Sequence, residues 1–521
     1  MKPIITIVLS VIFTTAMGQP PIIPLPATFS KSNQEFSLNQ NTAIVITNNT
    51  LKDEGYFLQK ELLKRFQLPV SIQNKEQNNN IVLVLNNKPQ NNPGGYSLLM
   101  GSNKITISAA DEEGIFNGII SLIQIATSHF TKEFPILLEG WNITDAPKYT
   151  WRGIMLDESR HFFGKEKVKE ILDWMAFYKL NKFHWHLTDE PGWRLQILKY
   201  PLLTLVGGIG NYNQPFAAAT YYSQENIKEI VAYAAERKID IIPEIDMPGH
   251  ATAANRAYPQ YSGGGSAKHP EFTFDPGNEA TYQYLTDILR EANTLFPSQM
   301  IHLGGDEVSF GNEKWKTNGG IKNLMGEHNL KDLKDVEEYF LQRMADTVYH
   351  LNSKVLAWDE MANASLPASQ TIIFWWRHDK PEQLKLALKN KFPVVVCPRI
   401  PFYFDFVQDS AHKIGRKWGS AFSSLEELYS FDVNKLIDKG ERPLILGVQA
   451  NIWTERIETD QRLDFMLFPR ISALAETAWS QNKKDYNNFF DRLRTQLPLY
   501  KNSGIFYFNP EQVSKVIEPE K

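Results

Sequence analysis

Several features that would mark out a class of protein are scarce or absent in this 521-residue chain. It contains one cysteine, Cys397, so no internal disulfide can form and the fold must depend on its hydrophobic core. No apolar run approaches the roughly 20 residues that a transmembrane helix needs. The formal net charge of −4, without a strongly basic run, argues against general binding of nucleic acid or anionic membranes. Neither a Walker motif nor a G-x-G-x-x-G fingerprint marks a nucleotide site.

The first residues have the pattern of an export signal. Lys2 supplies a positive charge, residues 4–13 are mostly apolar, and Ala16-Met17-Gly18 places small residues before a cleavage site. We therefore expect residues 1–18 to be a signal peptide and the protein to be exported, either to the periplasm or to the medium. The single cysteine favours a bacterial envelope over a disulfide-rich eukaryotic secretory route. The alternative is a cytosolic N-terminal strand.

Residues 19–145 have the pattern of a small α+β domain. Strand-like runs at 43–47 and 81–85 flank a helical stretch at about 55–66. The sequence YSLLM-GSN-KITIS predicts a hairpin over 96–108, because a Gly-Ser-Asn turn separates two strand-like runs. Asp111 then opens a helical segment that extends to about His129.

From residue 146 to about 505 a different unit repeats, in which a short apolar run precedes polar or aromatic residues and then usually a helical pattern. Helix-like stretches occur, for example, at 165–180, 223–237, 280–295 and 335–350. Strands that alternate with helices predict a parallel sheet, and eight such units fit a closed (β/α)8 TIM barrel of the α/β class. Residues 506–521 would then be a C-terminal tail. The eight apolar runs are 151–157, 182–189, 239–246, 300–307, 354–360, 371–377, 392–398 and 444–453.

Acidic and tryptophan side chains stand at the late ends of these runs. A barrel core needs branched apolar residues, and a buried charge is costly without a partner. Active sites in this fold lie at the C-terminal mouth, where residues distant in sequence converge. We therefore expect a site there that draws on Asp157, Asp189, Asp246, Asp306, Glu307, Trp358, Trp376 and Trp453.

The motifs that contain these residues resemble a known family. In family order, the chain contains WRGIMLDESRHFF, HWHLTDEPGWR, PEIDMPGH, HLGGDEV, WDE, YFD and NIWTE. Together they resemble glycoside hydrolase family 20, the β-N-acetylhexosaminidases, over the whole barrel, and the N-terminal segment resembles the family's small first domain. The resemblance implies an exo-acting enzyme that removes terminal β-linked GlcNAc or GalNAc, with a carbohydrate as its partner and no cofactor or metal. Glu190-Pro191 replaces a pair that is commonly more polar.

Asp306 and Glu307, in HLGGDEV, are the expected catalytic residues. Neighbouring carboxylates repel each other, and a raised pKa on one of them is a route to a proton donor. By resemblance, Glu307 is the general acid and Asp306 orients the substrate's 2-acetamido group. The acetamide oxygen would then be the nucleophile, with an oxazolinium intermediate and net retention, and Glu307 would later act as the base toward water.

The resemblance also implies a pocket wall of tryptophans. Trp358, Trp376 and Trp453 would desolvate the acetamide methyl group and press the acetamide oxygen toward C1. We choose Trp376 over Trp375 because Arg377 follows it, as in the family's W-[KR] pattern. Neighbouring residues of a strand point to opposite faces, so only one of the two indoles can face the pocket.

Polar residues implied by the resemblance would hold the rest of the sugar. The Tyr403 hydroxyl would bond to the acetamide oxygen, while Arg152 would present a fork of donors to hydroxyls. Arg152 stands near the start of a strand, however, and strand starts face the other rim of a barrel. The full set of these substrate-binding residues is Arg152, Asp189, His250, Tyr403, Asp405 and Glu455.

The histidines support a rival interpretation. His184 and His186 would face one side of a strand, and with His250, His302 and several aspartates they could complete a metal site, as in amidohydrolase-like barrels. A metal-dependent amide hydrolase or deacetylase is therefore the second hypothesis, and a non-catalytic carbohydrate-binding protein is the third. In the first hypothesis His250 and His302 have a structural or proton-network role that could link Asp246 to Glu307.

Overall fold

The computed structural model describes residues 18–86, 93–417, 419–515 and 517–520. Within it the chain divides into two compact units, Met1–Ala146 and Pro147–Lys521. Apart from Gly18, the predicted signal peptide lies outside the described residues. Among the helices of the described segments, none combines the length and apolar character required to cross a membrane.

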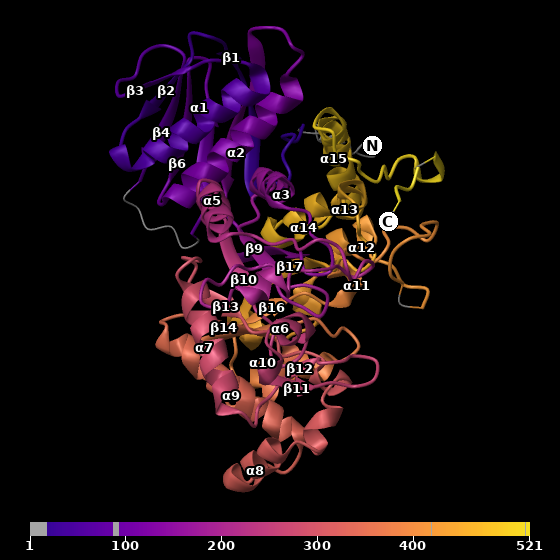
Figure 1. Ribbon diagram of the computed structural model, residues 1–521. Helices are drawn as coiled ribbons and strands as arrows, with labels where there is room; N and C mark the ends of the chain where they lie inside the picture. The colour runs from indigo at the N-terminus through magenta and orange to yellow at the C-terminus, as the bar shows by residue number, and fades with distance from the viewer. Residues whose placement is uncertain (1–17, 87–92, 418, 516, 521) are drawn as a thin grey trace, which may run out of the picture. The chain divides into compact units, whose positions relative to one another are not determined.

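The first unit is a seven-stranded mixed sheet with two helices packed on it (Figure 1). The strand order is β1-β7-β5-β6-β4-β2-β3. The predicted hairpin is confirmed as the antiparallel pair β5–β6, and Asp111 caps the second helix by accepting a bond from the backbone N–H of Gly114 at 2.7 Å. The elements are β1 (Thr28–Leu38), β2 (Ala43–Ile46), α1 (Lys52–Phe66), β3 (Ser71–Gln73), β4 (Asn80–Leu85), β5 (Tyr96–Met100), β6 (Lys104–Ala109), α2 (Glu112–His129) and β7 (Ile136–Asp145).

The second unit is a closed barrel of eight parallel strands, which confirms the predicted fold class. Each predicted apolar run contains one barrel strand, and the barrel closes where β17 (Ile445–Ile452) pairs with β8 (Trp151–Asp157). Apolar side chains such as Ile242, Leu356 and Phe374 fill its interior. The strands are β8 (Trp151–Asp157), β9 (Lys182–His186), β10 (Asp240–Glu244), β13 (Met300–His302), β14 (Lys354–Trp358), β15 (Thr371–Trp375), β16 (Val394–Val396) and β17 (Ile445–Ile452).

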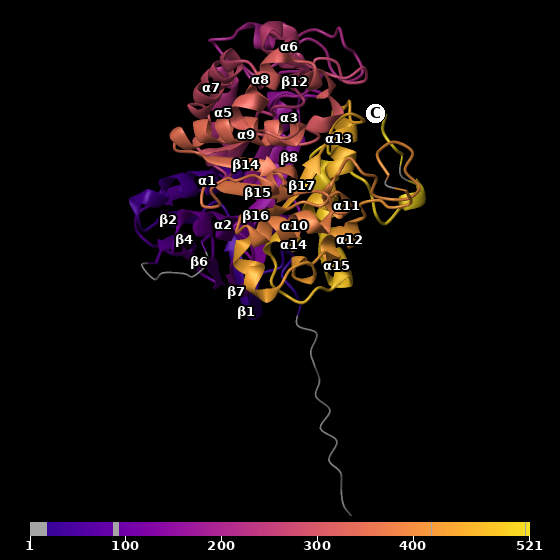
Figure 2. The same ribbon diagram turned by 90° about the horizontal axis from the view of Figure 1, so that it is seen from below.

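Helices surround these strands (Figures 1 and 2). The four helical stretches named from the sequence correspond to α3 (Lys165–Phe177), α5 (Gln224–Ala235), α7 (Glu279–Asn293) and α9 (Leu333–His350). The segments after β9 and β10 are long and carry short helices and a two-stranded sheet, so they build up the C-terminal side of the barrel. The helices and small strands are α3 (Lys165–Phe177), α4 (Leu202–Leu205), α5 (Gln224–Ala235), α6 (Thr252–Ala257), β11 (Ser262–Gly264), β12 (Thr273–Phe274), α7 (Glu279–Asn293), α8 (Gly319–His328), α9 (Leu333–His350), α10 (Pro381–Lys389), α11 (Arg399–Phe402), α12 (Leu425–Ser430), α13 (Asp460–Leu467), α14 (Arg470–Trp479) and α15 (Tyr486–Asn502).

The register of the strands places ionisable residues in one layer at their carboxyl ends. Asp157 is paired with His186, His186 with Glu244, and Glu244 with His302 across four neighbouring strands. All four side chains are buried. A buried charge is costly without a partner, so the groups of this layer must be paired with one another. The layer lies at the carboxyl ends of the barrel strands, where the candidate site is found.

Candidate active site

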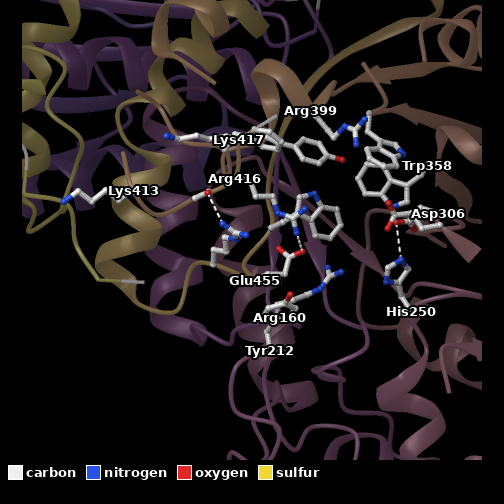
Figure 3. A pocket seen from close by; sticks show the side chains of 17 residues that line it. Arg160, Tyr212, His250, Asp306, Trp358, Arg399, Lys413, Arg416, Lys417 and Glu455 are labelled. Carbon is white, nitrogen blue, oxygen red and sulfur yellow. Dashed lines mark hydrogen bonds and ion pairs between the residues drawn. The ribbon is translucent and has the colours of Figure 1, made fainter. Parts of the chain in front are cut away.

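A pocket of about 720 Å³ opens at the carboxyl ends of the barrel strands (Figure 3). Eight of the predicted site residues line it, while Asp189 and Asp405 are buried beside it and contact lining residues. Arginine and lysine residues that the sequence did not single out complete the wall. The lining residues are Arg160, Tyr212, His250, Asp306, Glu307, Trp358, Trp376, Arg399, Tyr403, Phe406, Lys413, Gly415, Arg416, Lys417, Trp453, Glu455 and Arg456.

The carboxylates Asp306 and Glu307 reach the pocket through a tight turn after β13. Gly304 and Gly305 have φ values of 67° and 87°, which glycine adopts without strain. A Cβ on Gly304 would lie 1.8 Å from Asp246 Oδ1, so the backbone approaches that carboxyl group more closely than any side chain permits. Glu307 is itself left-handed, with φ of 51°. Backbone strain at a residue that lines a pocket is typical of functional sites.

Burial favours the protonated form of Glu307. Desolvation, reinforced by the charge of Asp306, raises the pKa of Glu307 above its ordinary value. The Oδ1 atom of Asp306 is buried without a hydrogen-bond partner among the described residues, and its Oδ2 atom lies 3.5 Å from His250 Nε2. One carboxyl group is thus held toward its protonated form, and the adjacent carboxylate has a free acceptor atom for a ligand donor.

Asp189 is buried beside this pair and contacts two histidines and an arginine. It faces His250 Nδ1 at 3.1 Å, His186 Nε2 at 2.9 Å and Arg160 Nη2 at 2.7 Å. Burial alone would raise the pKa of Asp189, but Arg160 and His250 outweigh it and hold that pKa well below its ordinary value. Burial likewise would lower the pKa of His250, and Asp189 with Asp306 raises it well above its usual range. An imidazolium therefore faces Asp306.

The network continues to a tryptophan of the pocket wall. His186 Nδ1 lies 2.7 Å from Glu244 Oε2, and the indole Nε1 of Trp358 donates to Glu244 Oε1 at 2.8 Å. His302 Nδ1 lies 3.2 Å from the same oxygen. The buried layer thus fixes the orientation of Trp358, and His302 belongs to this layer rather than to the pocket lining.

Four aromatic side chains form a wall of the pocket, and two of them, Trp358 and Trp453, also pack on histidines of the buried network. The rings of Trp358 and Trp453 are 6.0 Å apart, those of Tyr403 and Trp453 6.3 Å, and those of Trp376 and Tyr403 6.2 Å and nearly parallel. Trp376 lines the pocket, whereas Trp375 turns to the other side and donates its Nε1 to the carbonyl oxygen of Lys380. This enclosure suits a small apolar group such as a methyl.

A second acidic pair lies at another end of the pocket. Arg416 Nε is 3.1 Å from Asp405 Oδ2, and the same guanidinium pairs with Glu455. Burial raises the pKa of Asp405 to about 7 although Arg416 opposes that shift. Oxygen atoms of Asp405 and Glu455 remain buried without hydrogen-bond partners in the described structure, so both residues have acceptor capacity for hydroxyl groups.

The assignment of Arg152 to the substrate is wrong. Its side chain is buried at the start of β8, where Nε donates to the carbonyl oxygen of Lys179 at 2.8 Å and Nη1 to that of Tyr149 at 3.0 Å. Arg160 of the same motif does line the pocket, and its guanidinium lies over the Trp453 ring at 5.0 Å. The rule that barrel sites form after strand ends favours Arg160, because it follows Asp157 by three positions in the same motif.

Three sets of side chains have the spacing of metal ligands within the described segments. Each offers ligand atoms within 4.8 Å of one another: His184, Glu244 and His302; Asp189, Glu190 and His250; and Asp246, His250 and Asp306. In the second set Arg160 and the imidazolium already balance the charge of Asp189. In the first set Glu244 accepts from Trp358. At these two sets a divalent cation would therefore have to displace existing donors.

Comparison with known proteins identifies both units. The family model described as "Glycosyl hydrolase family 20, catalytic domain" matches residues 149–482, and that of its "domain 2" matches residues 19–146. The chain is 30% identical to a beta-hexosaminidase of Porphyromonas gingivalis over 94% of this chain and 64% of the relative, so it spans less than two thirds of that protein. It is 31% identical to a beta-hexosaminidase of Vibrio furnissii over 87% of this chain and 76% of the relative.

Solved structures agree with this match. A beta-N-acetylhexosaminidase from Bacteroides fragilis superposes with a TM-score of 0.83 at 28% identity, over 96% of this chain and 99% of the other. An exo beta-N-acetylglucosaminidase from Vibrio harveyi, solved in complex with N-acetylglucosamine, superposes with a TM-score of 0.87 at 29% identity, over 95% and 79%. The likeness thus extends over both units of the chain.

Proposed function

The chain belongs to glycosyl hydrolase family 20, and from this we propose that it is an exo-acting β-N-acetylhexosaminidase that removes terminal β-linked GlcNAc or GalNAc. The relatives named above are two beta-hexosaminidases, a beta-N-acetylhexosaminidase and an exo beta-N-acetylglucosaminidase, which supports this proposal. The observation that supports the proposal most strongly is the joint placement of Asp306 and Glu307 beside a compact aromatic enclosure. An acid next to an acetamide-sized apolar wall is what a substrate-assisted mechanism requires.

In the first step, Glu307 donates its proton to the glycosidic oxygen as the C1–O bond breaks. Its raised pKa keeps a larger share of the acid form at working pH. The acetamide oxygen of the same sugar attacks C1, and an oxazolinium ion forms. Asp306, beside His250, accepts the acetamide N–H, and this bond strengthens as positive charge develops on the amide.

The aromatic wall supplies the geometry of that attack. Trp358, Trp376 and Trp453 enclose the acetamide methyl and hold the carbonyl oxygen close to C1. The nucleophile is therefore already in position before the bond forms, which lowers the entropic cost of the attack. Burial raises the pKa of Tyr403 well above its ordinary value, so its hydroxyl stays protonated and donates to the acetamide oxygen.

In the second step, Glu307, now a carboxylate, takes a proton from water as that water attacks C1 and opens the oxazolinium ring. Two displacements on the same carbon give net retention of the β configuration. Asp405, Glu455 and Arg160 hold the hydroxyl groups of the sugar, and a pocket that encloses one terminal residue gives the exo mode.

We also propose that the protein is exported to the periplasm or secreted. This rests on the signal-like pattern of residues 1–18 alone. N-terminal sequencing of the mature protein from a fractionated native host tests it: a chain that starts near residue 19 in the exported fraction supports export, and an intact Met1 in the cytosol overturns it.

The activity is tested with purified protein, an aryl β-GlcNAc and the matching aryl β-glucoside, each with and without EDTA. We expect rapid release from the acetamido sugar only, unchanged by the chelator, and a loss of at least about 10²-fold in Glu307→Gln. Equal cleavage of the plain glucoside would contradict the acetamide nucleophile. Loss of activity with EDTA would favour the metal-dependent hypothesis instead, and no turnover of either substrate would favour a binding protein.

A further inference from the structure

A second pocket, of about 520 Å³, lies at the other end of the barrel strands from the catalytic pair, and we call it the amino-end pocket. Lys148 and Tyr149 of its lining precede β8, and Ile445 of its lining is the first residue of β17. β8 has 7 residues, and a strand rises about 3.3 Å per residue, so roughly 20 Å of strand separates the two pockets. Their linings share no residue.

Positive charge dominates the lining of the amino-end pocket. Four basic residues, Lys148, Arg442, Lys483 and Lys484, line it together with one acidic residue, Asp432. The whole chain has fewer basic than acidic residues, 55 against 59, so this concentration is not a reflection of composition. The four cations come from three segments that are distant in the sequence: one before β8, one before β17 and one after α14. The fold thus brings them together.

Most of this positive charge has no partner in the protein. Within the segments that the structure describes, none of the four cations forms an ion pair within 4.0 Å. Asp432 accepts from the backbone N–H of Asn434 at 3.1 Å and from its side-chain amide at 2.9 Å. Glu476, which attracts Lys484, is already paired with Arg492 at 2.9 Å. One carboxylate therefore faces four cations in the pocket.

Two of the cations are partly withdrawn from water. Lys148 and Lys484 are both only partly exposed. Lys484 Nζ donates to the hydroxyl of Thr477 at 3.2 Å and lies 4.7 Å from the centre of the Tyr429 ring. Burial lowers the pKa of Lys148, and it lowers the pKa of Lys484 to about 8. An ammonium group that loses hydration without gaining an anion is unfavourable, so an anionic ligand would stabilise both groups.

We propose that the amino-end pocket binds a phosphate or sulfate group, at a site separate from the catalytic pocket. The oxygen atoms of such a group accept charge-assisted hydrogen bonds from several ammonium and guanidinium groups at once. The volume of about 520 Å³ exceeds the need of an inorganic anion, since a water molecule takes about 30 Å³. The pocket therefore has room for part of a molecule that carries the group. This inference does not depend on the proposed function.

The test measures the acetylation of individual lysines in the full chain by acetic anhydride at pH 8, with peptide mass spectrometry as the readout. Sodium sulfate is compared with sodium chloride at equal ionic strength. Only a neutral amine is acylated, and the lowered pKa of Lys484 leaves a large share of it neutral at this pH. A bound sulfate would cover Lys148 and Lys484 and favour their protonated forms, so their labelling should fall by at least about threefold. Lys385 and Lys389, exposed on α10 outside the pocket, should be labelled equally in both salts.

Matched variants locate the bound anion. Lys148→Gln/Arg442→Gln removes two cations from the pocket and keeps Lys484 as the reporter, so sulfate should no longer protect Lys484. The control Lys385→Gln/Lys389→Gln removes the same charge from exposed positions on α10. It should leave the protection of Lys484 unchanged.

A third salt identifies the source of the group. Short-chain dextran sulfate is used at the same concentration of sulfate groups as the sodium sulfate. Stronger protection of Lys484 by dextran sulfate would support a group carried on a larger molecule, and equal protection would support a free anion. No protection of Lys484 in the wild type, equal protection of Lys385, or protection that persists in Lys148→Gln/Arg442→Gln would overturn the inference.

Discussion

Replacement of Asp189 by asparagine tests the buried network beneath the catalytic pair. The substitution keeps the shape of the side chain, so no cavity forms and its cost is electrostatic. Asp189 is 2% exposed and faces Arg160, His186 and His250 within 3.1 Å. Removal of one partner from a buried, hydrogen-bonded set of charges costs about 3–5 kcal/mol. We expect the free energy of unfolding of Asp189→Asn, measured in urea at pH 7, to fall by about 3 kcal/mol or more.

The neighbouring residue provides a matched control. Glu190 pairs with His269 at 3.1 Å, but the side chains are 27% and 23% exposed, so Glu190→Gln should cost less than about 1 kcal/mol. In the folded protein the pKa of Asp189 is well below its ordinary value. The charged Asp189 therefore stabilises the fold fully at pH values above its pKa in the unfolded chain, and this stabilisation is lost as the pH falls through its pKa in the folded protein. The difference between Asp189→Asn and the wild type should therefore shrink below about pH 4. Equal costs for both variants at pH 7 would refute the reasoning.

Further predictions concern the pocket itself. Trp376→Phe should lower kcat/KM on an aryl β-GlcNAc by about tenfold. Trp375→Phe alters the indole outside the pocket and should change kcat/KM by less than about threefold. Equal effects of the two substitutions would contradict the placement of the two rings. Gly304→Ala should abolish activity and lower the melting temperature. The added Cβ would overlap Asp246, and the residue has a left-handed φ of 67°. A variant with wild-type stability and activity would contradict this, because it would show that the turn can accommodate the methyl group. Because burial raises the pKa of Glu307, the alkaline limb of kcat/KM should lie above the ordinary glutamate pKa of about 4.3, and a limb at that ordinary value would contradict the acid role.

The barrel could be predicted from the sequence because each of its strands is a short apolar run followed by polar residues. That pattern reflects burial of parallel strands on both faces. The same reasoning placed Asp306, Glu307 and Trp453 at the mouth, where the structure has them. Strand ends are fixed by the fold, so residues on them can be located from the chain alone.

Residues on loops could not be located in this way. Arg416, Lys413 and Lys417 reach the pocket from the segment after α11, whose path depends on tertiary hydrogen bonds such as those to Glu518. Glu244 was missed for another reason: it ends β10 among apolar residues, and only the pairing of neighbouring strands shows that it meets His186. Pairing across strands is a long-range property that one strand's sequence does not contain.

The central claim, that the substrate's own acetamide is the nucleophile, is tested most directly by weakening that nucleophile. The measurement is kcat/KM for aryl β-glucosaminides whose N-acyl group carries no, one, two or three fluorine atoms, with the aryl group held constant. Fluorine withdraws electrons from the carbonyl oxygen and changes the size of the group little. The account predicts a steep fall in kcat/KM with each added fluorine. Rates that do not depend on fluorination would contradict it, because they would show that the acetamide oxygen forms no bond to C1.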